Sequence, residues 1–405
     1  MIAAIVFAAV VSAQQFSALP LDAALRAAVA HSPDVEQARQ RVRENAALLA
    51  AAKGGAAPSL TANYAAAPQA GNDNNTVIQQ LTTVGGQVTL GDYLAYAPLV
   101  RQAAFTLAGA QSDLIEAQRA ERLKSAGLYF SVLKAIAALQ LREQDYAGRS
   151  SDMHAAQLRY RAGDAPRIDV VRAQVALASA QADLDAARVD LANAQNALEV
   201  ETGSAPAAFA QLQPLAQPAP VPANADAAVT RALLMRSDLA SAKSAIAAEE
   251  AAVDATRRGF FPAVTVSAGY TSGVDTGIAV HGPSANVTLS VPVSRAQSAR
   301  VEAEQARLDE ARAKAEGIRR QIVLDVGSAA RTYAETLRAQ ISAARARAAA
   351  QAELRATQVG YRNGASSSLD VSDARRTYLQ AALNEVSAVY AAAQAQAVLE
   401  EEIGP

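Results

Sequence analysis

The sequence of 405 residues contains no cysteine and no tryptophan, and aromatic residues make up only 4% of it. Without cysteine, the chain can form no disulfide, no thiolate metal site and no lipid-modified N-terminal cysteine. Hydrophobic residues reach 51%, but much of this fraction is alanine, whose small side chain buries little area. Cores built from alanine are thin, so we expect helices that approach one another closely.

The formal net charge is only −2, whereas a protein that neutralises phosphates would need a basic excess. The three histidines lie far apart, without the spacing of metal ligands. The sequence also lacks a glycine-rich phosphate loop, a nucleophile elbow and a pair of catalytic carboxylates. We therefore expect no nucleic-acid partner and no enzymatic activity, and we assign no catalytic, cofactor-binding or metal-binding residue.

Long apolar runs are missing as well, because no stretch reaches eighteen consecutive apolar residues, the minimum for a spanning helix. Residues 1–13 are apolar and uncharged and end in Val11-Ser12-Ala13, which suits a small-residue cleavage site. We expect a secretory signal peptide at 1–13, although it lacks the usual basic residue before the apolar run. The sequence thus indicates an exported protein without an α-helical anchor.

The most informative feature that is present is a repeat of about 200 residues. The first copy reads Tyr160-Arg161-Ala162-Gly163 and then Asp169-Val170. Adding 201 to these numbers gives Tyr361-Arg362-Asn363-Gly364 and then Asp370-Val371. A fixed long period indicates a duplicated structural unit. We place the first repeat at 14–203, a proline-rich linker at 204–225 and the second repeat at 226–405.

Each repeat is expected to contain a long helical hairpin, at 98–202 and at 294–403. These intervals are poor in proline and rich in good helix formers, and a helix from 98 to 160 would be about 90 Å long. We expect hairpin turns at Gly163 and Gly364, and a capping box at Ser294 and Gln297. Heptad spacing predicts a coiled-coil seam, formed by Leu177, Leu184, Leu191 and Leu198.

Two short segments in each repeat alternate between apolar and polar residues, which predicts strands. They lie at about 58–66, 84–91, 262–270 and 285–292. Such strands could form a half-buried sheet in a soluble domain. Their polar residues are small and uncharged, however, and this favours strands with lipid on one side and water on the other. An aromatic girdle is expected at their helix-side ends, formed by Tyr93, Tyr96, Phe260 and Phe261.

Four strands cannot close a barrel, and open edges are not tolerated in hydrocarbon, so we expect the chain to oligomerise. Two copies would give eight strands, whose interior fills with side chains, and three would give twelve strands that leave a pore. Transport through the middle favours three copies. Between the strands of each pair we expect polar loops at 67–83 and 271–285.

The duplicated halves, the strand pairs, the helical hairpins and the two Gly-x5-Asp-Val turns resemble the TolC-like outer-membrane efflux proteins. The fold class that this resemblance implies is mainly α with a small β part, in a homotrimer with a twelve-stranded β-barrel continued by a twelve-helix α-barrel. The implied function is an exit duct in the outer membrane that extends into the periplasm. Such ducts serve tripartite efflux pumps or type I secretion systems, with outer-membrane lipid, a periplasmic adaptor and an inner-membrane pump as partners.

The resemblance also implies a gate at the hairpin tips. Asp370 and Asp373 match the acids that line the constricted opening, and Tyr361 matches a tyrosine that holds it shut. Asp169 matches the acid that binds this tyrosine and an arginine. The arginine is replaced here by Ser366, and the possible substitutes are Arg362 and Arg167. Alternatively, each acid is only a helix-start carboxylate favoured by the helix dipole.

A soluble periplasmic coiled-coil scaffold or adaptor is the competing interpretation, because long alanine-rich hairpins suit either class. An adaptor would carry one central hairpin and not two equivalent hairpins, each beside a strand pair. The cargo stays open, since such ducts are shared among exporters of drugs, metal ions and proteins.

Overall fold

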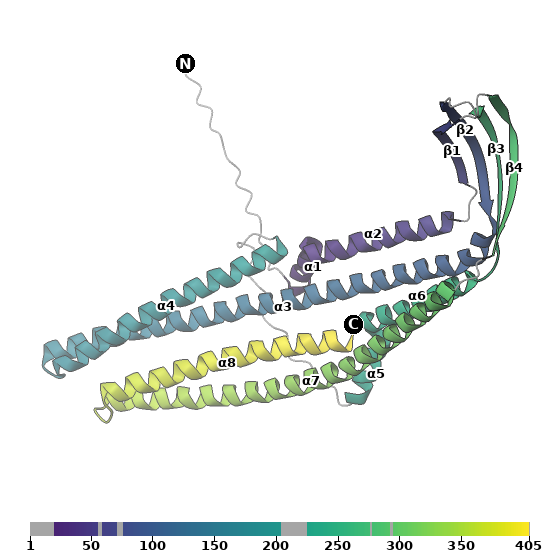
Figure 1. The fold of residues 1–405 in the computed structure, drawn as a ribbon. Coiled ribbons are helices and arrows are strands. Elements are labelled where there is room, and N and C mark those ends of the chain that lie inside the picture. The colour runs from purple at the N-terminus through teal and green to yellow at the C-terminus, as the bar shows by residue number, and fades with distance from the viewer. Residues whose placement is uncertain are drawn as a thin grey trace, which may run out of the picture. The chain divides into compact units, whose positions relative to one another are not determined.

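The computed structural model describes residues 20–55, 59–70, 76–203, 225–275, 278–291 and 295–404. The order of elements runs twice through two short helices, two strands, a very long helix and a shorter helix (Figure 1). The first repeat contains α1 (Leu21–His31), α2 (Pro33–Gly54), β1 (Ser59–Ala70), β2 (Thr76–Thr89), α3 (Leu90–Ala162) and α4 (Arg167–Thr202). The second contains α5 (Ala225–Met235), α6 (Ser237–Arg258), β3 (Ala263–Asp275), β4 (Ile278–Ser290), α7 (Arg295–Arg362) and α8 (Ser368–Ile403).

Some expected boundaries differ from the structure, and others lie outside the described residues. The expected signal peptide and nearly all of the expected linker lie outside the described residues. Helix α3 begins at Leu90 and contains Pro98, so the proline does not mark its start as we expected. Proline removes one backbone donor and kinks a helix, but here the helix continues through it. The side-chain amide of Gln297 donates to the carbonyl oxygen of Thr256 at 2.7 Å rather than serving a capping box, and Ser294 is not described.

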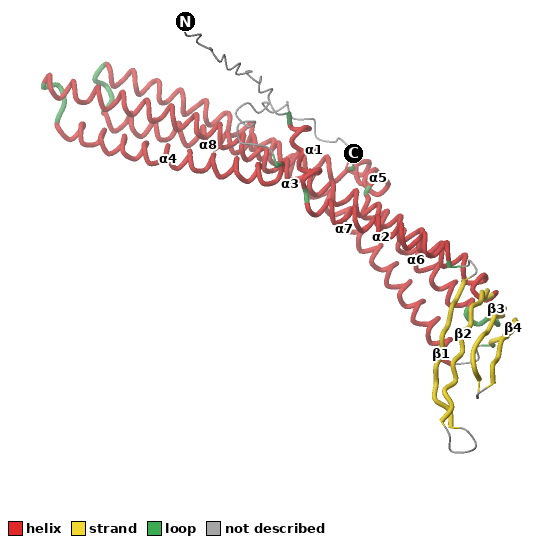
Figure 2. The backbone as a smooth tube through the Cα atoms, turned by 90° about the horizontal axis from the view of Figure 1, so that it is seen from above, coloured by secondary structure: helices red, strands yellow, loops and turns green. Residues whose placement is uncertain are grey.

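The four strands form one antiparallel sheet in the order β1-β2-β3-β4 (Figure 2). The strands are longer than expected, because β1 reaches Ala70 and β3 reaches Asp275. Much of the expected loops at 67–83 and 271–285 is therefore strand. Glycine, threonine and glutamine in these stretches suggested loops, but continuous pairing with a neighbouring strand satisfies their backbone groups.

The register gives this sheet one apolar and one polar face. Leu60, Tyr64, Val84, Tyr270 and Val287 lie on the same face, because antiparallel partners share a face, and all are exposed in the single chain. The opposite face carries mostly small uncharged residues, among them Thr83 and Thr271, whose hydroxyl oxygens lie 3.2 Å apart. Leu81, Asp275 and Ile278 lie on this face as well. The alternation read from the sequence is thus found in the sheet. At its helix-side end, Phe260 and Phe261 are also exposed.

The chain divides into two compact units, and each is described by itself. The first consists of Met1–Val35, Gln118–Leu234 and Leu324–Pro405. Its main apolar cluster lies where α1, α3, α4 and α8 meet and includes Tyr129, Val132 and Leu198. The heptad seam is confirmed at Leu184 and Leu198, which are 3% and 0% exposed.

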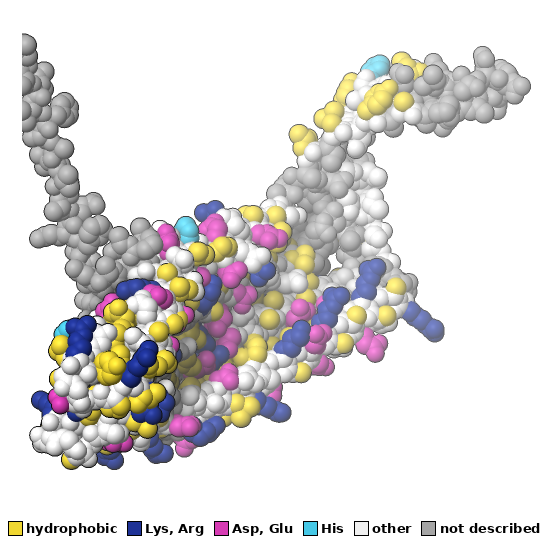
Figure 3. Space-filling model, turned by 90° about the vertical axis from the view of Figure 1, so that its left-hand side faces the viewer, with side chains coloured by type: hydrophobic (Ala, Val, Ile, Leu, Met, Phe, Trp, Pro, Cys, Tyr) yellow, Lys and Arg dark blue, Asp and Glu magenta, His cyan; other side chains and the backbone are white. Residues whose placement is uncertain are grey.

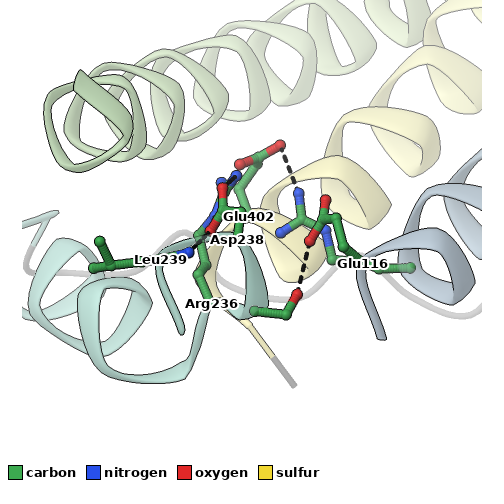
Figure 4. Close-up of polar contacts among 7 residues, drawn as sticks. Glu116, Arg236, Asp238, Leu239 and Glu402 are labelled. Atoms are coloured by element: carbon green, nitrogen blue, oxygen red, sulfur yellow. Dashed lines mark hydrogen bonds and ion pairs between the residues drawn. The ribbon is translucent and has the colours of Figure 1, made fainter. Parts of the chain in front are cut away.

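Ion pairs supplement this core at the ends of α4 and α8. Glu201, near the end of α4, accepts a hydrogen bond from Lys124 Nζ at 2.6 Å. Near the end of α8, Glu402 lies 3.5 Å from Arg119, a pair shown in Figure 4, and Glu401 lies 3.7 Å from Arg122. All three carboxylates are more than four-fifths buried. These helix ends are thus held by basic residues of α3 that pair with their terminal acids.

A buried carboxyl, Glu121, lies next to this set. Its two oxygens accept hydrogen bonds from the hydroxyls of Ser32 at 2.8 Å and Ser125 at 3.2 Å. Ser32 separates α1 from α2, so this contact attaches the break between those helices to α3. Burial, together with a hydrogen bond to Glu201, raises the pKa of Glu121. Burial opposes ionisation of Glu201 too, but hydrogen bonds from Glu121 and Lys124 lower its pKa. The two carboxyls titrate as a coupled pair, in which the pKa of Glu121 is the one that is raised.

The second unit consists of Glu36–Ala117 and Met235–Val323 and includes the sheet. The break between α5 and α6 is attached to α3 in the same way as the break at Ser32. The hydroxyl of Ser237 donates to Glu116 of α3 at 2.8 Å (Figure 4). Helix α6 is linked to α3 through Asp254 and Arg101, 3.2 Å apart. It is linked to α7 as well, through an ion pair of 3.1 Å between Glu250 and Arg312.

The raised pKa of Glu121 leads to a prediction about stability and pH. A group whose pKa is raised on folding stabilises the fold at pH values below its unfolded pKa, and that contribution is lost as pH rises through the folded pKa. Glutamine needs no proton to make these hydrogen bonds. As pH rises through the folded pKa of Glu121, we therefore expect the free energy of unfolding of Glu121→Gln to increase relative to that of wild type, by about 1 kcal/mol, the size of one hydrogen bond. Thermal unfolding in detergent between pH 4 and 8 measures the difference.

Glu201→Gln serves as the matched control, because the pKa of Glu201 is shifted downward. Its stability relative to wild type should change in the acidic range, where the contribution of Glu201 is lost as pH falls through its folded pKa. Lys124 and Asp34, the other charged groups near the pair, remain in both variants. Parallel pH profiles for wild type and Glu121→Gln would contradict the prediction.

Candidate functional site

The two hairpin tips, where α3 turns into α4 and α7 turns into α8, gather most of the residues that the sequence analysis singled out. Gly163 and Gly364 have φ angles of 83° and 77°, a left-handed conformation that residues with a Cβ rarely adopt. The amide after each glycine bonds back to the last helical turn, from Asp164 to Arg159 at 2.8 Å and from Ala365 to Gly360 at 2.7 Å. The chain needs glycine at both positions to end the helix and reverse direction.

Asp370 belongs to a capping box at the start of α8. Its carboxylate accepts a hydrogen bond from the amide of Ser367 at 2.7 Å, and its own amide donates to the Ser367 hydroxyl at 3.2 Å. The hydrogen bonds from the Ser367 backbone and side chain lower the pKa of Asp370. Asp373, one turn later, forms an exposed ion pair of 2.8 Å with Arg376. Asp370 therefore has the helix-start role that we considered as the alternative, and it remains exposed and ionised.

Asp169 links the two hairpins. Its Oδ1 accepts a hydrogen bond of 2.8 Å from the hydroxyl of Ser368 on α8, and Arg172 of its own helix lies 3.7 Å away. The basic partner is thus Arg172 rather than Arg362 or Arg167, the two substitutes named from the sequence. Arg362 donates instead to the carbonyl oxygen of Gln358 at 3.4 Å, and Arg167, the first residue of α4, is exposed.

Tyr361 also touches the other hairpin, through its ring. The guanidinium carbon of Arg159 lies 4.7 Å from the centre of this ring, a cation–π contact between α3 and α7. Ser366, which stands in place of the missing arginine, packs its hydroxyl against Gly360 of the preceding turn. Tyr361 and Asp169 therefore both contribute to the contact between hairpins, but through Arg159 and Ser368, which the sequence analysis did not name.

Further contacts between α3 and α8 lie above the tips. Arg149 donates to the hydroxyl of Ser372 at 2.9 Å, and Arg375 lies 2.9 Å from Asp152. Sequence reasoning missed all four residues. One signal was available, because Gly148 stands in the middle of an alanine-rich helix, where glycine costs about 1 kcal/mol relative to alanine and so calls for a structural reason.

A groove of about 780 Å³ lies between the hairpins at this end of the unit. Its walls combine arginine and aspartate side chains with apolar ones from α4 and α8, including Val171, Val175 and Leu369, which are exposed in the single chain. Figure 3 views the hairpin end and shows apolar side chains gathered between basic ones. The site is thus a contact surface between helices with charged and apolar parts.

The described residues contain no cluster of three or more histidine or acidic side chains that could hold a metal ion. Among the same residues, no helix is long and apolar enough to cross a membrane.

Comparisons with known proteins agree with this architecture. The sequence matches the family described as outer membrane efflux protein over residues 24–204 and 228–404, one match for each repeat. A search of curated protein sequences finds no match.

Among solved structures, the chain is similar to the outer-membrane protein VceC from Vibrio cholerae, with 18% identity and a TM-score of 0.79 over 95% of this chain and 96% of that one. It is similar to the CmeC outer-membrane channel of Campylobacter jejuni, with 15% identity and a TM-score of 0.81 over 95% and 85% of the two chains. The open state of the MtrE outer-membrane channel of Neisseria gonorrhoeae has 18% identity and a TM-score of 0.77 over 95% and 88%.

These likenesses show a shared fold, and the family match covers far more than half of the sequence. The resemblance noted from the repeated turns is confirmed, and the interpretation as a soluble scaffold or adaptor is not favoured. The chain belongs to the outer membrane efflux protein family and is an efflux duct of the outer membrane that extends into the periplasm.

Proposed function

We propose that three copies of the chain assemble into one continuous channel, which receives substrate from an inner-membrane pump and a periplasmic adaptor and releases it outside the cell. The observation that carries this proposal is the two-faced sheet. Its apolar face is exposed in the single chain, and its edge strands, β1 and β4, each have only one neighbour. Hydrocarbon does not tolerate unpaired strand edges, so β1 of one copy would pair with β4 of the next.

Three copies suit the chemistry of the polar face. Twelve strands enclose an aqueous pore, whereas eight would fill their interior with side chains. The opposite face carries hydroxyl and amide groups, such as those of Ser267 and Asn286, which are partners across β3 and β4. Such groups suit a water-filled interior, while the apolar face suits lipid. The long helices would continue the channel on the periplasmic side, with the hairpin tips as its opening.

The tips would form the gate of this channel. Asp370 and Asp373 are exposed near the start of α8, and three copies would place them as rings of carboxylates at the periplasmic opening. The hydrogen bonds from Ser367 lower the pKa of Asp370, which favours the charged form of each carboxylate in the ring. Asp169, Tyr361 and their partners would hold the hairpins together in the closed state, with Arg172 and Arg159 as the basic residues involved. In this scheme Arg362 and Arg167 are secondary candidates.

The first prediction in this scheme concerns assembly. Chemical cross-linking in detergent should give a threefold species, and planar bilayers should show ionic conductance, because four strands cannot close a barrel alone. Pairs of cysteines placed on β1 and β4 should cross-link between copies, and the natural chain has no cysteine to interfere. A stable monomer without conductance, or recovery of the protein in the soluble periplasm, would contradict the proposal.

The second prediction concerns the acid rings. The double variant Asp370→Asn with Asp373→Asn should lower the preference for cations and the block by multivalent cations. The loss should be about tenfold in local cation concentration, the low end of what charged clefts achieve. Reversal potentials in salt gradients measure it. Asparagine keeps an oxygen for the cap at Ser367, so helix α8 should persist. Asp309→Asn, in the second unit, is the control, and unchanged selectivity in the double variant would place these carboxylates away from the lumen.

The third prediction concerns the closed state. Asp169→Ala removes the acceptor of the Ser368 hydrogen bond, and the resting conductance should rise about five- to a hundredfold, as expected for 1 to 3 kcal/mol. Tyr361→Phe keeps the ring that Arg159 contacts and should raise conductance only if the hydroxyl contributes. Ser366→Arg should lower conductance by restoring a basic residue at the turn. If Arg362→Ala or Arg167→Ala opens the channel instead, the gate uses those arginines.

A further inference from the structure

The contact between Arg375 and α3 explains a glycine that has no other role. Gly148 lies inside α3, far from either end of the 73-residue helix. A Cβ at this position would overlap Nη1 of Arg375 and lie 2.9 Å from its Cζ. The guanidinium of Arg375 therefore rests directly on the backbone of α3, and it can do so only because residue 148 has no side chain.

Asp152, one turn after Gly148, holds this guanidinium in place. Nη2 of Arg375 lies 2.9 Å from Oδ2 and 3.1 Å from Oδ1 of Asp152, so one nitrogen contacts both carboxylate oxygens. The arginine side chain is only 14% exposed, and its Nε is buried without a hydrogen-bond partner in the structure. The carboxylate of Asp152 is 40% exposed, so the pair is partly buried, and its hydrogen bonds are charge-assisted.

The duplication provides an internal comparison. The same offset of 201 that relates the two turns relates Gly148 to Ala349 and Arg375 to Gln174. The contact of α3 with α8 thus has both the glycine and the arginine, whereas the equivalent positions on α7 and α4 have neither. This joint presence and joint absence is expected if the glycine serves the arginine. A helical hairpin requires neither residue, because the second hairpin forms without the glycine and the first without the arginine.

We propose that Gly148, Asp152 and Arg375 form a latch that holds the second hairpin, α7 and α8, against α3 in the closed duct. The latch lies on the same face of α8 as Ser368 and Ser372, which bond to Asp169 and Arg149. Through Arg375, the latch places a buried arginine between the hairpins. At the turn itself, where the family resemblance implies an arginine, this chain has Ser366. The three residues are positioning residues for the gate, and the inference rests on the proposed function because a latch matters only in a channel that opens.

Opening the tips would have to break this contact. If α8 moves away from α3, the guanidinium leaves its place on the backbone and Asp152 loses its partner. Hydrogen bonds to charged groups typically contribute enough to shift an equilibrium by about tenfold or more. Loss of the latch should therefore raise the open fraction of the resting channel by about tenfold.

The test uses a substitution that should strengthen the helix while it breaks the latch. Gly148→Ala improves the helix propensity of α3 but occupies the place of the guanidinium. Arg375→Gln installs the residue that the other repeat has at the equivalent position. Gly317→Ala is the matched control, because the same change in α7 meets no atom within 4 Å. Full-length wild type and variants are compared for resting conductance in planar bilayers and for backbone hydrogen exchange in detergent.

We expect Gly148→Ala and Arg375→Gln to raise resting conductance about tenfold and to speed exchange at residues 368–376, while exchange around residue 148 is unchanged or slower. Gly317→Ala should match wild type in both measurements. If Gly148→Ala behaves like Gly317→Ala in exchange and conductance, the latch is refuted. If no protein conducts, wild type included, the proposed function fails, and hydrogen exchange alone decides whether the contact holds α8.

Discussion

Thin apolar contact between alanine-rich helices is the constraint on which the rest of this structure depends. Alanine lets long helices lie close together, but each contact buries little area, so a sliding of one helix along another would cost little. Discrete polar contacts set the positions of the helices instead. Ser32 binds Glu121 at the break between α1 and α2, and Lys124 binds Glu201 at the end of α4. Each of these polar contacts can form at only one relative position of its two helices, so it fixes their register.

The polar contacts of the first unit differ in how deeply they are buried. At the ends of α4 and α8, the carboxylates of Glu201 and Glu402 are 13% and 15% exposed and adjoin the main apolar cluster. At the tips, Asp373 and Arg376 of α8 are 52% and 75% exposed, and exposed ion pairs contribute little to stability. Asp169 and Arg375, which join the hairpins there, are only 17% and 14% exposed. The proposed gate would therefore depend on these few buried contacts between the hairpins.

Patterns that repeat within short segments could be predicted from the sequence, whereas contacts between residues far apart in the chain could not. The alternation around Tyr64 and Tyr270, the heptad through Leu184 and Leu198 and the turns at Gly163 and Gly364 are all visible within short windows, and the structure contains each of them. The start of α3 was misplaced because a proline was taken as a boundary. The pair of Arg375 with Asp152 joins residues 223 positions apart, and no spacing in one sequence shows which arginine faces which acid. Only the unexplained glycine at 148 hinted at it.

The few charged residues of the four strands bear on how the proposed channel would select its cargo. In the sequence of all four strands, Asp275 is the only acid, Lys and Arg are absent, and His281 lies on the apolar face. The register places Asp275 on the polar face, at the last residue of β3, and the other polar residues of that face are uncharged. In the proposed channel, the membrane section would therefore discriminate by charge only at the end of β3 that lies farthest from α6. The proposed carboxylate rings at the hairpin tips would be the other place where charge is sorted.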